Sequence, residues 1–162
     1  MRPMARPDRP VTLAPPPPPR VLKAMNVVMR PVLSSRWGRR VPGVMLLEFR
    51  GRRTGRTLRV PVNFHLVDGT PMAFTDAPWR LNFTGGAPVT VTHRGRVHRT
   101  RGELHVVSPQ EMAEAVRKSL DAGGSAQRMG LRIRRGHEVS VEDLAALGPA
   151  LGTSVITFDV GR

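Results

Sequence analysis

The sequence has no cysteine and no tyrosine, and it has few aromatic residues. Without cysteine, disulfide bonds and thiolate metal sites are excluded. Aromatic residues make up 4% of the 162 residues, so the stacking platforms of a protein that binds single-stranded nucleic acid are scarce. No apolar run is long enough to span a bilayer, and the apolar core of a signal peptide is absent. These absences favour a cytoplasmic protein.

The charge is strongly unbalanced. Lys and Arg total 26 against 12 Asp and Glu, which gives a formal net charge of +14, and only Lys23 and Lys118 are lysines. Such an excess can serve a nucleic acid, an anionic membrane surface or an anionic ligand, or it can simply be a solvated surface. No recognition-helix pattern or zinc-finger spacing accompanies it, so we expect no specific nucleic-acid partner.

The composition of the chain changes near residue 20. Residues 1–20 include an unbroken proline run at 15–19 and predict a disordered or polyproline leader, and residues 21–162 predict a single domain. Residues 21–33 carry apolar side chains at three- and four-residue steps, which predicts an amphipathic helix that Pro31 kinks or ends near Arg30. This helix packs on the domain or, as a basic amphipathic helix, rests on a membrane surface at the inner face.

Alternation of apolar residues and turn signals predict the strands. The Asp68-Gly69 pair is a strong two-residue hairpin signal. The expected strands are 44–49, 57–67, 72–75, 89–92, 96–107 and 154–160, with a short helical piece at 79–83.

Two helices are expected before the last strand. Ser108 and Glu111 form a capping-box pattern that opens the first helix, which ends at Gly123-Gly124, and Ser140 opens the second in the same style. Short connections between strands imply antiparallel pairing. The predicted fold is therefore mostly β (α+β): a split β-barrel of about six antiparallel strands with an N-terminal amphipathic helix.

Residues 51–55 read Gly-Arg-Arg-Thr-Gly, and Arg56 and Arg59 follow. Guanidinium forks and the free N–H groups of a tight turn suit phosphate or carboxylate groups. This segment therefore predicts a polyanionic small molecule held at the edge of the sheet. Arg52 and Arg56 are expected to face solvent, because alternate residues of a turn cannot all converge on one ligand.

With these pieces in order, the chain resembles a known family. The segments that carry the resemblance are LLEFRGRRTGRTLRVPVNF at 46–64, WRLNFTGGAPVTV at 79–91 and the helix after SPQE at 108. They resemble the deazaflavin-dependent nitroreductase and quinone reductase family of the split β-barrel, flavin-reductase-like superfamily. The resemblance covers about residues 25–160.

The resemblance implies a coenzyme and a reaction. The coenzyme is F-420, an 8-hydroxy-5-deazaflavin with a ribityl phosphate and an oligoglutamate tail, with FMN as the alternative. The implied reaction is hydride transfer from the reduced coenzyme to a small-molecule substrate: a quinone, a nitroaromatic or an activated alkene. No catalytic side chain is required, because the cofactor carries the chemistry. The proton comes from solvent or from Thr75.

The resemblance also implies the site residues. Arg53 and Thr54 fall where the family holds phosphate or tail carboxylates, and Asn82 matches the asparagine of the phosphate region. The complete expected cofactor-binding set is Arg53, Thr54, Gly55, Arg59, Val60, Pro61, Val62, Thr75, Trp79 and Asn82. The family's substrate-facing tyrosines are missing, so Asn63 and Thr75 are expected to line the substrate pocket.

Simpler roles stand beside these expectations. Thr54 and Gly55 can serve only the turn, Trp79 can fill the core, and Asn82 can cap a short helix. His65, His93, His98 and His105 are interpreted as exposed strand histidines, and no metal site is expected. Two other functions remain open: a non-catalytic flavin- or deazaflavin-binding module, and a basic surface protein that binds nucleic acid or anionic membrane. The expected state is monomer or homodimer.

Overall fold

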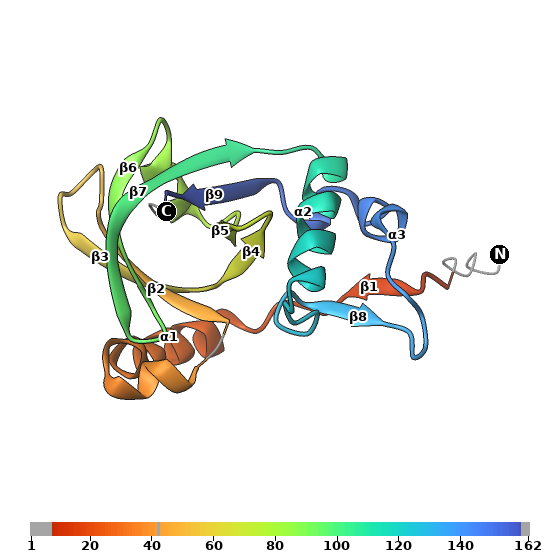
Figure 1. Cartoon of the computed structure of the whole chain (residues 1–162), viewed down its shortest axis with the longest axis horizontal. Coiled ribbons are helices and arrows are strands. Elements are labelled where there is room, and N and C mark those ends of the chain that lie inside the picture. The colour runs from red at the N-terminus through yellow and green to blue at the C-terminus, as the bar shows by residue number, and fades with distance from the viewer. Residues whose placement is uncertain (1–7, 42, 160–162) are drawn as a thin grey trace.

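The computed structural model describes residues 8–41 and 43–159 (Figure 1). In chain order the elements are β1 (Val11–Leu13), α1 (Pro19–Ser34), the 3₁₀ helix η1 (Arg36–Arg40), β2 (Val44–Arg50), β3 (Thr57–Asn63), β4 (His65–Val67), β5 (Thr70–Phe74), the 3₁₀ helix η2 (Pro78–Phe83), β6 (Ala87–His93), β7 (Arg96–Val106), α2 (Pro109–Asp121), β8 (Leu131–Ile133), α3 (Val141–Ala145), the 3₁₀ helix η3 (Gly148–Leu151) and β9 (Ser154–Phe158).

Seven strands form one curled antiparallel sheet in the order β3-β2-β6-β7-β9-β5-β4, and β1 and β8 form a separate antiparallel pair (Figure 1). The fold is β-rich α+β, as the sequence predicts. The expectation of about six strands was too low, because the main sheet alone has seven. The expected helix at the N-terminus and the two before the last strand are present as α1, α2 and α3.

The curl of the sheet comes from one joint in the chain. β3 and β4 lie at opposite edges of the sheet, yet only Phe64 separates them. Asn63 is the last residue paired with β2, and His65 is the first paired with β5. The predicted single strand 57–67 is therefore two strands, because the chain changes partner at Phe64 and carries one edge of the sheet to the other.

Two hydrophobic cores lie on the two sides of β5 and β9. Ala73 and Ile156 belong to the core inside the curled sheet. The adjacent residue on each strand, Phe74 on β5 and Val155 on β9, contacts the second core. This alternation is what a strand buried on both faces requires. The second core is covered by α2, α3 and the β1–β8 pair, which Figure 1 shows together beside the sheet.

Local signals set the positions of turns and helix starts. Asp68 and Gly69 have φ angles of 50° and 77°, the left-handed pair that a tight hairpin needs. Ser108 and Glu111 make both hydrogen bonds of a capping box at the start of α2, and Ser140 and Asp143 do the same for α3. These predictions are confirmed.

The prediction of a disordered or polyproline leader is wrong at Val11–Leu13, which form the packed strand β1. Val11 is 2% exposed and belongs to the second core, and its strand pairs with β8, which the sequence analysis did not find. The Ala14 N–H also donates to the Gly130 carbonyl. Three residues of alternating burial are too short a signal to distinguish from a proline-rich linker. Residues 1–7 of the predicted leader lie outside the described residues.

Several element ends differ from expectation by one or more residues, among them those of α1 and β9. α1 begins at Pro19 and continues through Pro31 to Ser34, so it does not end near Arg30. β9 ends at Phe158, and Val160, the expected end, lies outside the described residues. Within residues 8–41 and 43–159, no helix has the length and apolar character needed to cross a membrane.

The buried position of Val11 leads to a stability prediction. Val11→Ala should lower the free energy of unfolding by about 2 kcal/mol, because two buried methyl groups are lost and a small cavity remains. Thr12→Ala, at the exposed neighbouring position, should change it by less than about 0.5 kcal/mol. Urea unfolding measures the free energy of unfolding of both variants. An unchanged value for Val11→Ala would show that this segment does not pack on the domain.

Candidate functional site

The 51–55 turn presents several arginines on a constrained backbone. The Gly55 N–H donates to the Gly51 carbonyl at 2.8 Å, and Gly55 has a φ of +67°, which favours glycine. Arg52, Arg53 and Arg56 are exposed. Among the described residues no carboxylate pairs with these three guanidinium groups. The turn therefore holds three cations that are available to an anion.

Asn82 ties this turn to η2 across thirty positions of sequence. Its Oδ1 accepts the Arg52 N–H at 2.7 Å, and its Nδ2 donates to the Trp79 carbonyl at 2.7 Å. The two motifs that the sequence analysis singled out are thus neighbours in space. Both polar groups of the Asn82 side-chain amide make hydrogen bonds within the protein, so Asn82 holds the turn against η2. Trp79 is half-buried, with its ring 5.8 Å from that of Phe49.

Arg59 is less available than its neighbours in the turn. Its Nε donates to Glu48 Oε2 at 2.7 Å, and the two residues face each other across β2 and β3. Both side chains are well exposed, so the pair contributes on the order of 1 kcal/mol or less to stability. An anion would have to share the Arg59 guanidinium with this carboxylate. Val60 and Val62 alternate with Arg59 and pack against the core inside the sheet.

β3 is an edge strand, and within residues 8–41 and 43–159 its one ladder partner is β2. Alternate backbone groups of an edge strand point away from its partner and can bond a ligand, and Pro61 lacks an N–H. β3 also contacts β5, although the two strands are not neighbours in the sheet order. Thr75 follows β5, where its N–H donates to the Ser154 carbonyl and its Oγ1 accepts the Ala77 N–H at 3.1 Å.

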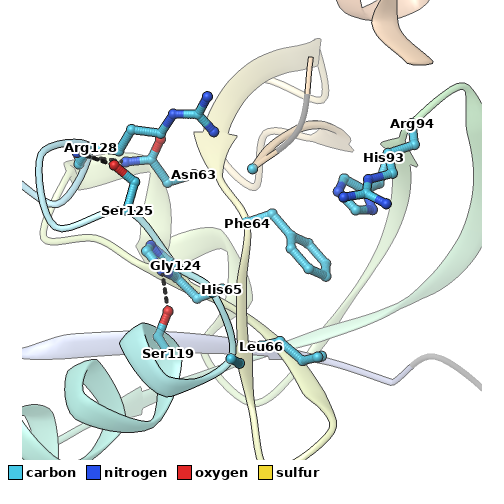
Figure 2. A pocket seen from close by; sticks show the side chains of 13 residues that line it. Asn63, Phe64, His65, Leu66, His93, Arg94, Ser119, Gly124, Ser125 and Arg128 are labelled. Carbon is cyan, nitrogen blue, oxygen red and sulfur yellow. Dashed lines mark hydrogen bonds between the residues drawn. The ribbon is translucent and has the colours of Figure 1, made fainter. Parts of the chain in front are cut away.

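A cavity of about 520 Å³ lies where β3 passes into β4 (Figure 2). It is bounded by this joint, by the end of β6 and by the C-terminal end of α2. Of the predicted site residues it contains Asn63, whose Nδ2 donates to the Arg128 carbonyl at 3.0 Å. The lining residues are Gly43, Asn63, Phe64, His65, Leu66, His93, Arg94, Ser119, Ala122, Gly123, Gly124, Ser125 and Arg128.

His65 is buried in the wall of this cavity, which contradicts its interpretation as an exposed strand histidine. It is 5% exposed, its Nδ1 lies 3.0 Å from Ser119 Oγ, and its ring stacks on Phe74 at 4.1 Å. Burial lowers the pKa of His65 from 6.5 to about 4. The imidazole is therefore neutral at neutral pH. α2 covers β4 here, and that tertiary contact has no signature in the strand itself.

His93 faces the same cavity from β6. Its ring stacks on Phe64 with 4.0 Å between ring centroids, and its buried Nε2 has no hydrogen-bond partner. Burial, and then the positive charges of Arg94 and His98, lower its pKa. Figure 2 shows the side chains of Phe64 and His93 at the edge of the cavity. His98 is exposed, as predicted, and His105 is half-buried with its Nε2 3.0 Å from Thr157 Oγ1.

No known family model matches this sequence, and no curated protein matches it. The resemblance to the deazaflavin-dependent family therefore stays a prediction. The geometry brings the predicted residues into two groups. Residues 52–56 and Asn82 meet at one end of β3, and Asn63 lies at its other end, on the cavity.

The low pKa of His65 predicts a pH dependence of stability. Between pH 6.5 and about 4 the unfolded chain takes up a proton on His65 that the folded chain does not, so the free energy of unfolding falls as the pH falls. The loss should reach about 3 kcal/mol below both values. His65→Gln should remove this part of the pH dependence in urea unfolding.

His98→Gln, at an exposed position, is the matched control and should leave the pH dependence unchanged. If the His65→Gln and wild-type proteins lose the same stability between these pH values, His65 titrates normally and is not buried as described.

Proposed function

We propose that this protein is an oxidoreductase that binds the reduced deazaflavin coenzyme F-420 along the edge strand β3. The observation that carries the proposal is the 51–55 turn beside Asn82, where Arg52, Arg53 and the following Arg56 are exposed and pair with no carboxylate of the described residues. A polyanionic tail is the ligand that such a group of guanidinium donors suits best. FMN, with a single phosphate, would use fewer of them. The proposal includes a fold of the split β-barrel, flavin-reductase-like superfamily.

The length of β3 supports this placement. Seven residues of strand extend roughly 20 Å, from the turn at Thr57 to the cavity at Asn63. The tail lies at the turn, held by Arg53 with the exposed Arg52 and Arg56 on either side, and the heterocycle lies over Pro61 and Val62. Arg59 contributes less, because Glu48 already holds its guanidinium.

The substrate is a planar quinone, nitroaromatic or activated alkene that lies in the cavity against Phe64. When bound, the reduced coenzyme supplies the hydride. The chain positions the two molecules and excludes water from between them. Asn63 lies at the junction of β3 and the cavity. The Thr75 hydroxyl accepts one N–H and keeps its own proton for another acceptor.

Titration of the protein with oxidised F-420, followed by fluorescence, tests binding. Arg53→Ala should weaken binding by about 10- to 100-fold, since a hydrogen bond to a charged group is worth ~1.5–3 kcal/mol. Arg132→Ala, which removes an exposed arginine from β8, is the matched control and should leave the affinity unchanged. Arg59→Ala should weaken the binding of F-420 less than Arg53→Ala does.

Two further results decide between the alternatives. Oxidation of reduced F-420 by menadione distinguishes an enzyme from a non-catalytic binding module. No binding of F-420 at tens of micromolar would contradict the proposal, and tight FMN binding that Arg53→Ala does not affect would place the flavin elsewhere.

A further inference from the structure

α1 has a wide apolar face that the domain covers only in part. Met29 is half-buried and Leu33 is 3% exposed where the helix meets the sheet. Val21, Met25 and Val28 are 46%, 53% and 62% exposed. Their spacing of four and three residues places them in one line along the helix. The side chains that the sequence analysis expected to pack are thus partly in solvent.

η1 follows α1 directly and contacts it. Its Trp37 is 53% exposed, and the Arg40 guanidinium lies 5.0 Å from the centre of the Trp37 ring. An exposed tryptophan with an arginine beside it is the pair of side chains that favours the interface between acyl chains and headgroups.

The charge around this face is of one sign. Residues 19–47, which include α1 and η1, contain six arginines and lysines and no aspartate or glutamate. In α1, Arg20, Lys23 and Arg30 occupy the side opposite to Met25 and Met29. A second copy of the chain would bring like charges together at this face, whereas anionic lipid headgroups would neutralise them.

The turn between β6 and β7 adds a second basic group at the same end of the molecule. α1 contacts β6, and Figure 1 shows β7 starting beside α1. A cavity of about 750 Å³ at this turn is lined by His93, Arg94, Arg96 and His98. Arg94 and Arg96 give this cavity its positive charge, so it suits the phosphate of a lipid headgroup.

We propose that the α1 surface (Val21, Met25, Val28 and Trp37 with the basic residues around them) binds an anionic phospholipid bilayer. The apolar line enters the boundary between headgroups and acyl chains. The basic residues of η1 and of the β6–β7 turn contact the phosphates, and those on the opposite side of α1 add attraction at longer range. The inference does not depend on coenzyme binding, because none of its residues belongs to the 51–55 turn or to β3, although His93 and Arg94 also line the cavity proposed for the substrate.

Co-sedimentation with vesicles tests the proposal. The full chain should bind equimolar phosphatidylglycerol–phosphatidylcholine vesicles and not pure phosphatidylcholine vesicles. Binding should weaken as salt rises. The emission of Trp37 should shift to the blue on binding, and Trp37→Phe should remove that shift, since the other tryptophan, Trp79, packs against the core.

Two matched pairs of variants separate the apolar and the basic contributions. Val28→Asp should weaken vesicle binding about tenfold, through loss of one buried aliphatic side chain and gain of a repelled charge. Val106→Asp, at an 81% exposed position on β7, should have no effect. Lys23→Gln with Arg96→Gln should weaken binding, and Arg132→Gln with Arg135→Gln should not.

Three results would overturn the proposal. The first is no binding to anionic vesicles at low salt. The second is binding that depends on the basic residues and is unaffected by Val28→Asp, which is adsorption without insertion. The third is a homodimer in sedimentation equilibrium that Val28→Asp dissociates, because a second copy would then cover the α1 surface.

Discussion

The joint at Phe64 links the shape of the sheet to the proposed site. The chain leaves β2 at Asn63 and joins β5 at His65, so the two edges of a seven-stranded sheet meet within one residue. Phe64 holds this joint through its N–H bond to the Gly43 carbonyl and its stack on His93, and His65 holds it through Ser119 and Phe74. The curl encloses the inner core, and the cavity lies at the point where the edges meet.

β3 then connects two chemically different ends. Its first end follows the turn that carries Arg52, Arg53 and Arg56, which Asn82 fixes to η2. Its last end opens on a cavity in which burial lowers the pKa of His65 and His93, beside the cations Arg94 and Arg128. In the proposed arrangement the anionic tail lies at the first end, and the planar ring of the substrate lies in the cavity at the second. A free strand edge between them offers backbone groups to a heterocycle.

Signals that act over a few residues predicted most of the fold. The Asp68-Gly69 hairpin and the capping boxes of Ser108 and Ser140 were found because short-range hydrogen bonds decide them. β1 and β8 were missed because only their mutual pairing and the second core stabilise three-residue strands. The resemblance assigned Arg53, Thr54 and Asn82 to one phosphate region, and the structure joins the turn to Asn82 through the Arg52 N–H. The burial of His65 was not expected, because α2, which covers this residue, begins more than forty positions later in the chain.

The central claim is that an anionic coenzyme lies along β3, and backbone amide resonances measured by NMR during titration with oxidised F-420 test it most directly. The account predicts shifts at residues 52–56 and 62–64 and at Thr75, with the β8 amides unchanged as an internal reference. Shifts confined to α1 and the β6–β7 turn, with residues 52–56 unaffected, would contradict it.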